Sequence, residues 1–315
     1  MTTSTVPAET WEEVEDPELA KDDVPVSRDV STRRLLVLQV LVFLASTLVG
    51  LALSIFDLEA GPDKVLLTGA KLGSAAVALS VVDRLGWYRR VGFCAPRRWN
   101  RLWLAWLPAG YVALALTGGA GDRSVLAVLG IVGLVLAVGL EEELWTRGLI
   151  LESLRWRGTT AAVVLSGVWF GALHSLNLLS GQPASVTAAQ VGFATAFGLG
   201  VGAVRVRVGT LWLPIALHAL YDLGVLLRNE EVTGISWREL LGFLVVIALP
   251  LAVFGLVLAR RSKVPGPDGR MPRRRVRVEP WAWPAHNVAA PPEAANVLGR
   301  WPAPPPHLVD QWYRR

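Results

Sequence analysis

Long apolar runs separated by short polar breaks fill the chain between Arg34 and Arg261. Each run is close to the ~20 residues that an α-helix needs to cross a bilayer. The runs predict about eight spans, over residues 34–56, 64–83, 101–118, 124–146, 159–178, 185–204, 209–227 and 237–259. The expected fold class is therefore all-α: a polytopic integral membrane protein with about eight transmembrane helices.

Composition changes this picture mainly at the two ends of the chain. Charged residues make up 18% of the sequence, below the roughly 25% of an average soluble domain. Most of them lie at the ends and in short loops. We expect an acidic disordered tail over residues 1–33, a transmembrane domain over 34–260, and a basic, Pro- and Trp-rich disordered tail over 261–315.

Charge in the loops indicates an orientation. Arginine and lysine gather before the first expected span and after the second, fourth, sixth and eighth, whereas the other loops are acidic, mixed or uncharged. Short cytoplasmic loops carry the excess of positive charge. This pattern predicts a multi-pass protein of the cell membrane with both termini in the cytoplasm, and it requires an even number of spans.

Ionisable side chains inside the expected spans indicate function, since each costs about 2.5–3.5 kcal/mol on insertion scales. By helical rise, Glu142, His174 and His218 lie about 20, 22 and 14 Å from the cytoplasmic ends of three different helices. They therefore fall within about one and a half helical turns of each other. The sequence predicts a shared polar cavity for these three side chains.

Spacing within each helix predicts local pairs. Glu143 and Arg147 are four residues apart, so they can form an ion pair on one helix face. Glu142 is rotated by about 100° from Glu143 and faces another neighbour. Each group also has a purely structural interpretation, such as a packing ion pair or a hydrogen bond across helices. For Lys71, which lies inside the second span, that interpretation is snorkelling or pairing with a nearby acid.

Three short motifs carry a resemblance to a known family. They read Glu142-Glu143-x-x-x-Arg147-Gly148, Phe170-x-x-x-His174 and His218-x-x-x-Asp222. In order, in spacing and in their placement on three spans they resemble the CPBP (CAAX-protease and bacteriocin-processing, or Abi) family of intramembrane endopeptidases, which includes the type II CAAX prenyl endopeptidase. The resemblance covers about residues 34–260 and makes that segment a protease domain. It departs from the pattern in an additional Glu141, and in Asp222, where the prenyl endopeptidase has Asn.

The resemblance implies hydrolysis of a peptide bond. Glu142 is expected to activate a water molecule, with assistance from His174. His218 is expected to stabilise the oxyanion, and Asp222 to fix its tautomer. The additional Glu141 leaves open which glutamate acts as the base.

The resemblance also implies a role for Glu143 and Arg147, and it raises the question of a metal ion. Glu143 with Arg147 would hold the catalytic helix in register. Glu142, His174 and His218 have the donor types of a His₂Glu zinc site, but the sequence lacks H-E-x-x-H. No cofactor is favoured, and zinc is the alternative.

Two other functions compete with proteolysis. A non-catalytic member could bind a peptide and serve immunity or regulation, and a transporter could use the same charges for protons. The intact motifs favour the protease. Its expected partners are a membrane protein or peptide substrate and the lipid bilayer, and no nucleic acid.

Overall fold

A computed structural model describes residues 11–14, 31–55, 62–119, 121–228, 234–261 and 274–277 of the chain. The chain divides into two units, of which Glu15–Arg273 contains all the described helices. Its first half holds α2 (Thr32–Ile55), α3 (Pro62–Leu85), α4 (Tyr88–Val91), η1 (Trp99–Ala105), α5 (Trp106–Leu116), α6 (Val125–Glu143), η2 (Leu144–Ile150), α7 (Leu151–Leu154) and η3 (Arg155–Arg157). Its second half holds α8 (Thr159–Leu173), η4 (His174–Ser180), α9 (Ala184–Val208), α10 (Trp212–Arg228), α11 (Trp237–Phe243), η5 (Leu244–Ala248) and α12 (Leu249–Arg260).

The other unit contains two short strands, β1 (Trp11–Val14) and β2 (Arg274–Arg277), which pair in antiparallel register. Apart from these strands, most of the two expected tails, 1–33 and 261–315, lies outside the described residues. Their disorder therefore stays a prediction. Helix α2 begins at Thr32, slightly before the expected boundary of the transmembrane domain.

The expected spans all coincide with helical segments of the described chain. Within the described residues, six helices are long and apolar enough to cross a membrane: Thr32–Ala52, Val65–Leu85, Val125–Arg157, Thr159–Ser180, Ala184–Val208 and Trp237–Arg260. The other two spans correspond to α5, with 11 residues after the seven of η1, and to α10, with 17 residues. The all-α, multi-pass membrane fold is confirmed, and the count of eight spans stays a prediction.

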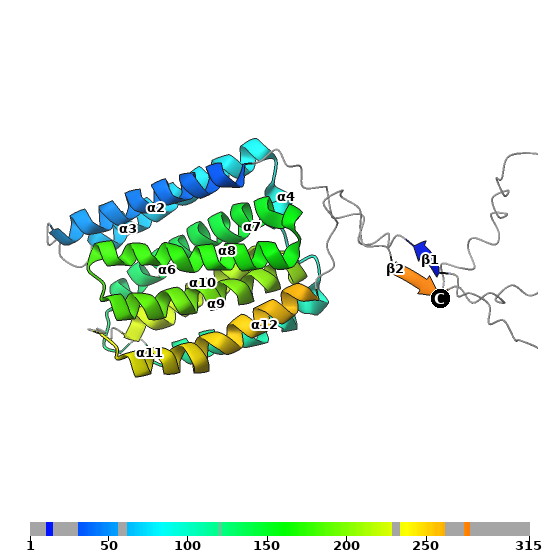
Figure 1. Ribbon diagram of the computed structural model, residues 1–315. Coiled ribbons are helices and arrows are strands. Elements are labelled where there is room, and N and C mark those ends of the chain that lie inside the picture. The colour runs from blue at the N-terminus through cyan, green and yellow to red at the C-terminus, as the bar shows by residue number, and fades with distance from the viewer. Residues whose placement is uncertain are drawn as a thin grey trace, which may run out of the picture. The chain divides into compact units, whose positions relative to one another are not determined.

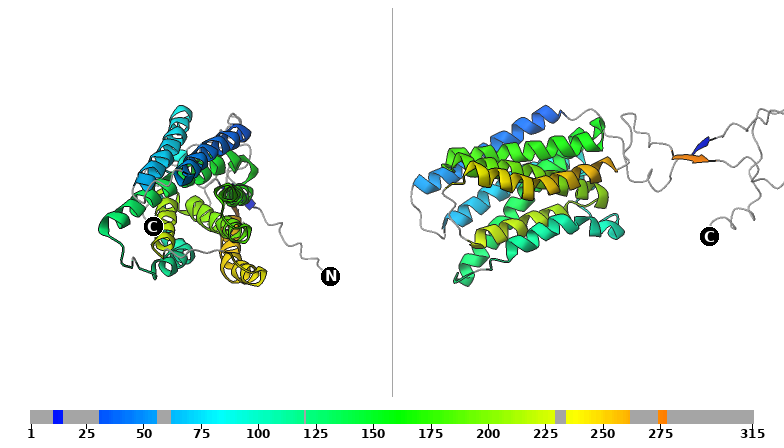
Figure 2. Two further views of the ribbon diagram at one scale, coloured as in Figure 1. Left: turned by 90° about the vertical axis from the view of Figure 1, so that its left-hand side faces the viewer. Right: turned by 60° about the horizontal axis from the view of Figure 1, so that its bottom comes forward.

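The helices lie side by side with their long axes roughly aligned (Figures 1 and 2). Helices α2 and α3 form one edge of the bundle, and α11 and α12 lie at the opposite edge. Between them, α9 packs against α8 and α12, while α6 packs against α3 and α10. Of the helices that carry the motifs, α6 and α10 therefore contact each other directly, and α8 contacts η2, the continuation of α6.

Two glycines let these helices approach closely. A Cβ atom added at Gly139 of α6 would lie 3.1 Å from the carbonyl oxygen of Ile215 and 3.3 Å from the Ala219 side chain, both on α10. A Cβ added at Gly171 of α8 would lie 2.7 Å from the carbonyl oxygen of Val191 on α9. Small residues allow such backbone contact between membrane helices. Gly139 thus lets α6 and α10, which carry the first and third motifs, approach closely. Gly171 lets α8, which carries the second motif, approach α9.

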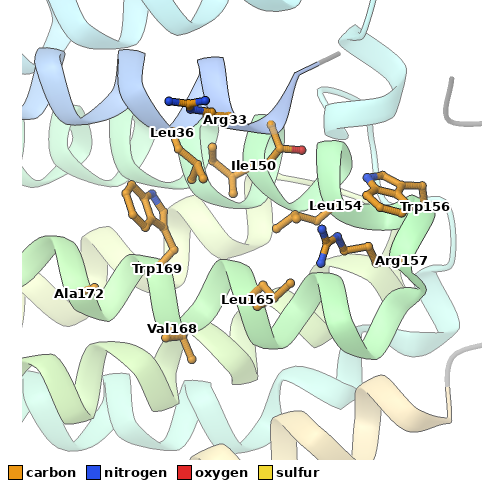
Figure 3. A pocket seen from close by; sticks show the side chains of 11 residues that line it. Arg33, Leu36, Ile150, Leu154, Trp156, Arg157, Leu165, Val168, Trp169 and Ala172 are labelled. Carbon is orange, nitrogen blue, oxygen red and sulfur yellow. The ribbon is translucent and has the colours of Figure 1, made fainter. Parts of the chain in front are cut away.

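A groove of about 720 Å³ opens between α2, α7, η3 and α8. Its walls are mainly apolar, and two exposed arginines, Arg33 and Arg157, also line it (Figure 3). The Arg157 guanidinium lies over the ring of Trp156, 4.7 Å from its centre. This groove shares no lining residue with the cavity at the three motifs that is described below.

Candidate active site

The helix that carries the first motif changes its winding directly after the acidic residues. Helix α6 ends at Glu143 and continues as a π-helix, η2, in which every residue is buried. Such π segments are rare and are frequent at functional sites. In the last turn of α6, Glu141, Glu142 and Glu143 are each rotated by about 100° from the next, so the three carboxylates meet different partners.

Glu141 turns towards α3. Its Oε2 atom lies 2.8 Å from Nζ of Lys71, and its Oε1 accepts a hydrogen bond of 2.5 Å from the Ser74 hydroxyl. The same hydroxyl accepts a hydrogen bond from the indole of Trp145. Lys71 also lies 3.5 Å from Oε1 of Glu142. Lys71 is thus part of the site, although the sequence signalled it only as a cation inside an apolar span.

Glu143 links the first and third motifs. Its Oε1 atom lies 3.1 Å from Nη1 of Arg147 and 2.9 Å from Nδ1 of His218. Glu143 and Arg147 are fully buried, and the expected pairing between them is present. The Arg147 guanidinium in turn lies 3.9 Å from the centre of the Phe170 ring, which belongs to the second motif.

The two ring nitrogens of His218 face different carboxylates of the motifs: Nδ1 faces Glu143, and Nε2 faces Asp222 and Glu142. A carboxylate accepts hydrogen bonds, so the Nδ1 atom that faces Glu143 carries hydrogen. The Nε2 atom lies 3.4 Å from Oδ2 of Asp222 and 3.9 Å from Oε2 of Glu142. Asp222 was expected to fix the His218 tautomer; it lies beside Nε2 while Glu143 contacts Nδ1, and its role stays a prediction. With a second hydrogen on Nε2 the ring is an imidazolium, and both of its nitrogens then face carboxylates.

His174 is the first residue of η4, directly after α8. Its Nδ1 atom lies 3.0 Å from the carbonyl oxygen of Phe170, and because a carbonyl only accepts, Nδ1 carries the hydrogen. Nε2 of the neutral ring then keeps its lone pair. The Phe170 ring meets both imidazoles edge to face, 4.9 Å from His174 and 5.6 Å from His218.

Comparison with known families agrees with this arrangement. Residues 124–224 match the family model described as Type II CAAX prenyl endopeptidase Rce1-like. The matched segment contains all three motifs, from Glu142 to Asp222. Over this segment the chain is similar to the CAAX-protease family. No curated protein matches the sequence.

A cavity lies at the meeting point of the three motifs. The cavity has a volume of about 620 Å³, within the size range of ligand sites, and His174, His218 and Asp222 line it. Glu142 is not among the lining residues, but its Oε2 atom lies 3.9 Å from Nε2 of His218, which is. The six expected site residues are therefore brought together: three at the cavity, Glu142 in contact with one of them, and the buried Glu143–Arg147 pair behind them.

The zinc alternative requires three donors around one point. In the part of the chain that the structure describes, no group of three or more His, Cys, Asp or Glu side chains is placed to hold a metal ion. Oε2 of Glu142 and Nε2 of His218 are 3.9 Å apart, whereas two ligands of a tetrahedral zinc ion, each ~2.1 Å from the metal, lie about 3.4 Å apart. This pair is about 0.5 Å wider than that spacing, and the zinc alternative stays a prediction.

Proposed function

We propose that the chain is an intramembrane endopeptidase that hydrolyses a peptide bond of a membrane-associated protein or peptide. The observation that supports this most is the position of His218. One of its nitrogens is held by the buried Glu143–Arg147 pair, and the other faces Glu142 and Asp222 at a cavity that also contains His174. A fixed imidazole between carboxylates beside a cavity is an arrangement suited to acid–base chemistry.

In this proposal Glu142 is the general base. It removes a proton from a water molecule in the cavity, and the oxygen of that water forms a bond to the carbonyl carbon of the substrate. His174 assists by accepting a hydrogen bond from the same water at Nε2. The tetrahedral intermediate then breaks its C–N bond, and Glu142 returns the proton to the leaving amine.

His218 stabilises the charge that develops on the carbonyl oxygen. Because Nδ1 already carries a hydrogen towards Glu143, this requires the doubly protonated imidazolium ring, whose Nε2 hydrogen donates to the oxyanion. Glu143 and Arg147 are positioning residues, because they orient the ring from behind. Asp222 lies beside Nε2 and favours the protonated ring that can donate there.

Neighbouring glutamates provide a matched test of the base. Glu142→Gln and Glu141→Gln each remove one carboxylate from the same helix turn, and both are compared with the wild type for peptide cleavage in detergent micelles. We expect Glu142→Gln to lower kcat by roughly 10²–10⁴-fold, as loss of a general base does. Glu141→Gln should retain most of the activity, because its partners are Lys71 and Ser74.

The outcomes separate the alternatives. Loss of cleavage in Glu141→Gln with activity retained in Glu142→Gln would reassign the base. Peptide binding without cleavage by the wild type would support a non-catalytic binding or immunity protein instead. Stoichiometric zinc in the purified wild type, measured by elemental analysis, would favour a metal-dependent reaction.

A further inference from the structure

The cavity at the motifs has an aromatic wall. Phe193 of α9 and Tyr221 of α10 are stacked, with ring centres 4.8 Å apart. Phe197 lies 5.8 Å from the Tyr221 ring, and Phe243 of α11 lies 6.0 Å from Phe193. All four side chains line the cavity. Aromatic surfaces of this kind bind bulky apolar groups.

The charged side chains of the cavity are of one sign. Its lining includes the carboxylates of Asp222 and Glu239, and none of the described residues that line it is Lys or Arg. The groove between α2 and α8 has the opposite character, since Arg33 and Arg157 line it (Figure 3). The cavity at the motifs and the groove between α2 and α8 therefore offer different electrostatic environments to a ligand.

Most of the charged motif side chains that adjoin the cavity lining are also acidic. Site and cavity together hold five carboxylates and two cationic side chains, namely Glu141, Glu142, Glu143, Asp222 and Glu239 against Lys71 and Arg147. The formal charge of this group stays negative even if both His174 and His218 are protonated. A cleft of one sign concentrates ligands of the opposite sign and disfavours ligands of its own.

From the aromatic wall and the acidic lining together, we infer that the cavity binds an internal peptide segment. A bulky apolar side chain occupies the aromatic part, and neutral or basic residues lie beside it. A free C-terminal carboxylate or an acidic side chain next to the apolar residue is disfavoured. This inference rests on the proposed function, because it names the substrate class of the same site.

Synthetic peptides test the inference directly. Each contains a central Phe-Leu-Val-Ala segment followed by Lys or by Glu, and each is made with a C-terminal amide or with a free acid. Binding of the fluorescently labelled peptides to Glu142→Gln is measured by polarisation, and cleavage by the wild type is measured as kcat/KM. We expect the Lys peptide with the amide to bind most tightly and to be cleaved fastest.

Glu239 offers a variant that changes the charge of the cavity alone. It lies at the start of α11, where its carboxylate accepts a hydrogen bond from the Ser236 backbone in a capping box. Glutamine preserves that box, so Glu239→Gln removes the charge and keeps the helix start. The matched control is Asp122→Asn, which removes an exposed carboxylate from a loop that is not part of the cavity lining.

We expect Glu239→Gln to reduce the preference for Lys over Glu about two- to five-fold, the scale of an exposed charge pair. Asp122→Asn should leave the preference as in the wild type. Equal binding of the Lys and Glu peptides, tighter binding of the free acids, or an unchanged preference in Glu239→Gln would overturn the inference. Selective binding without any cleavage would instead contradict the proposed function and leave the binding preference standing, so the two failures are distinguishable.

Discussion

At the level of single residues, Lys71 and Glu141 form an ion pair inside the helical unit, with 2.8 Å between Nζ and Oε2. Glu141 is fully buried, and Lys71 additionally lies 3.5 Å from Glu142 and 4.9 Å from the centre of the Phe43 ring. A buried charge without its partner is strongly destabilising. Lys71 therefore offsets the additional glutamate of the first motif and also borders the proposed base.

Replacing this lysine tests both consequences. Lys71→Met leaves Glu141 without its cation, so we expect thermal unfolding in detergent at lower temperature and a loss of stability on the order of 3 kcal/mol. The double variant Lys71→Met/Glu141→Gln removes both charges and should recover most of that stability. A single variant as stable as the wild type, or a double variant no better than the single one, would contradict the pairing.

At the level of helices, the contact between α6 and α10 determines whether the first and third motifs meet. Gly139 lies one turn before Glu142 and Glu143, where its missing side chain lets α10 approach. The 2.9 Å contact between Glu143 and His218 crosses this same interface. A change in helix separation should therefore disturb the site without altering any of its chemical groups.

Gly139→Leu places a side chain in this contact, and Gly133→Leu is its control. A Cβ atom at Gly133, on the same helix, meets nothing within 4 Å. We expect Gly139→Leu to lose cleavage activity by about 10²-fold, since a displacement of about 1 Å has an effect of this size. Gly133→Leu should remain close to the wild type. Equal activities of the two variants in a kcat measurement would argue against the role of the contact.

At the level of the whole molecule, the helices were predictable because bilayer thickness fixes the length of each apolar run. The pairing of Glu143 with Arg147 was also predictable, since it depends only on helical spacing. The contact of Glu143 with His218 was not, because it depends on how α6 and α10 are rotated against each other. Lys71 was recognised as an intramembrane cation, but its partner could not be chosen from sequence.

The orientation in the membrane remains a prediction from loop charge, and cysteine labelling tests it. In a Cys94→Ser background, Asp122→Cys and Arg157→Cys each place a thiol at an exposed position. An impermeant maleimide added to intact cells should label the first variant and not the second. Permeabilised cells should show labelling of both. The reverse pattern in intact cells would invert the predicted topology.

The π-helical winding of η2 also restricts which sequence changes this segment can accept. Glu143 before it pairs with Arg147 and contacts His218 on α10, while Glu152 after it pairs with Arg205 on α9. A π turn contains more residues than an α turn. The π segment therefore determines the directions around the helix axis in which Glu143 and Glu152 point. Loss of one residue would turn one of these glutamates by about 100° away from its partner. Natural variation in this segment should therefore be confined to exchanges at its apolar positions, with Arg147 kept and without insertions or deletions.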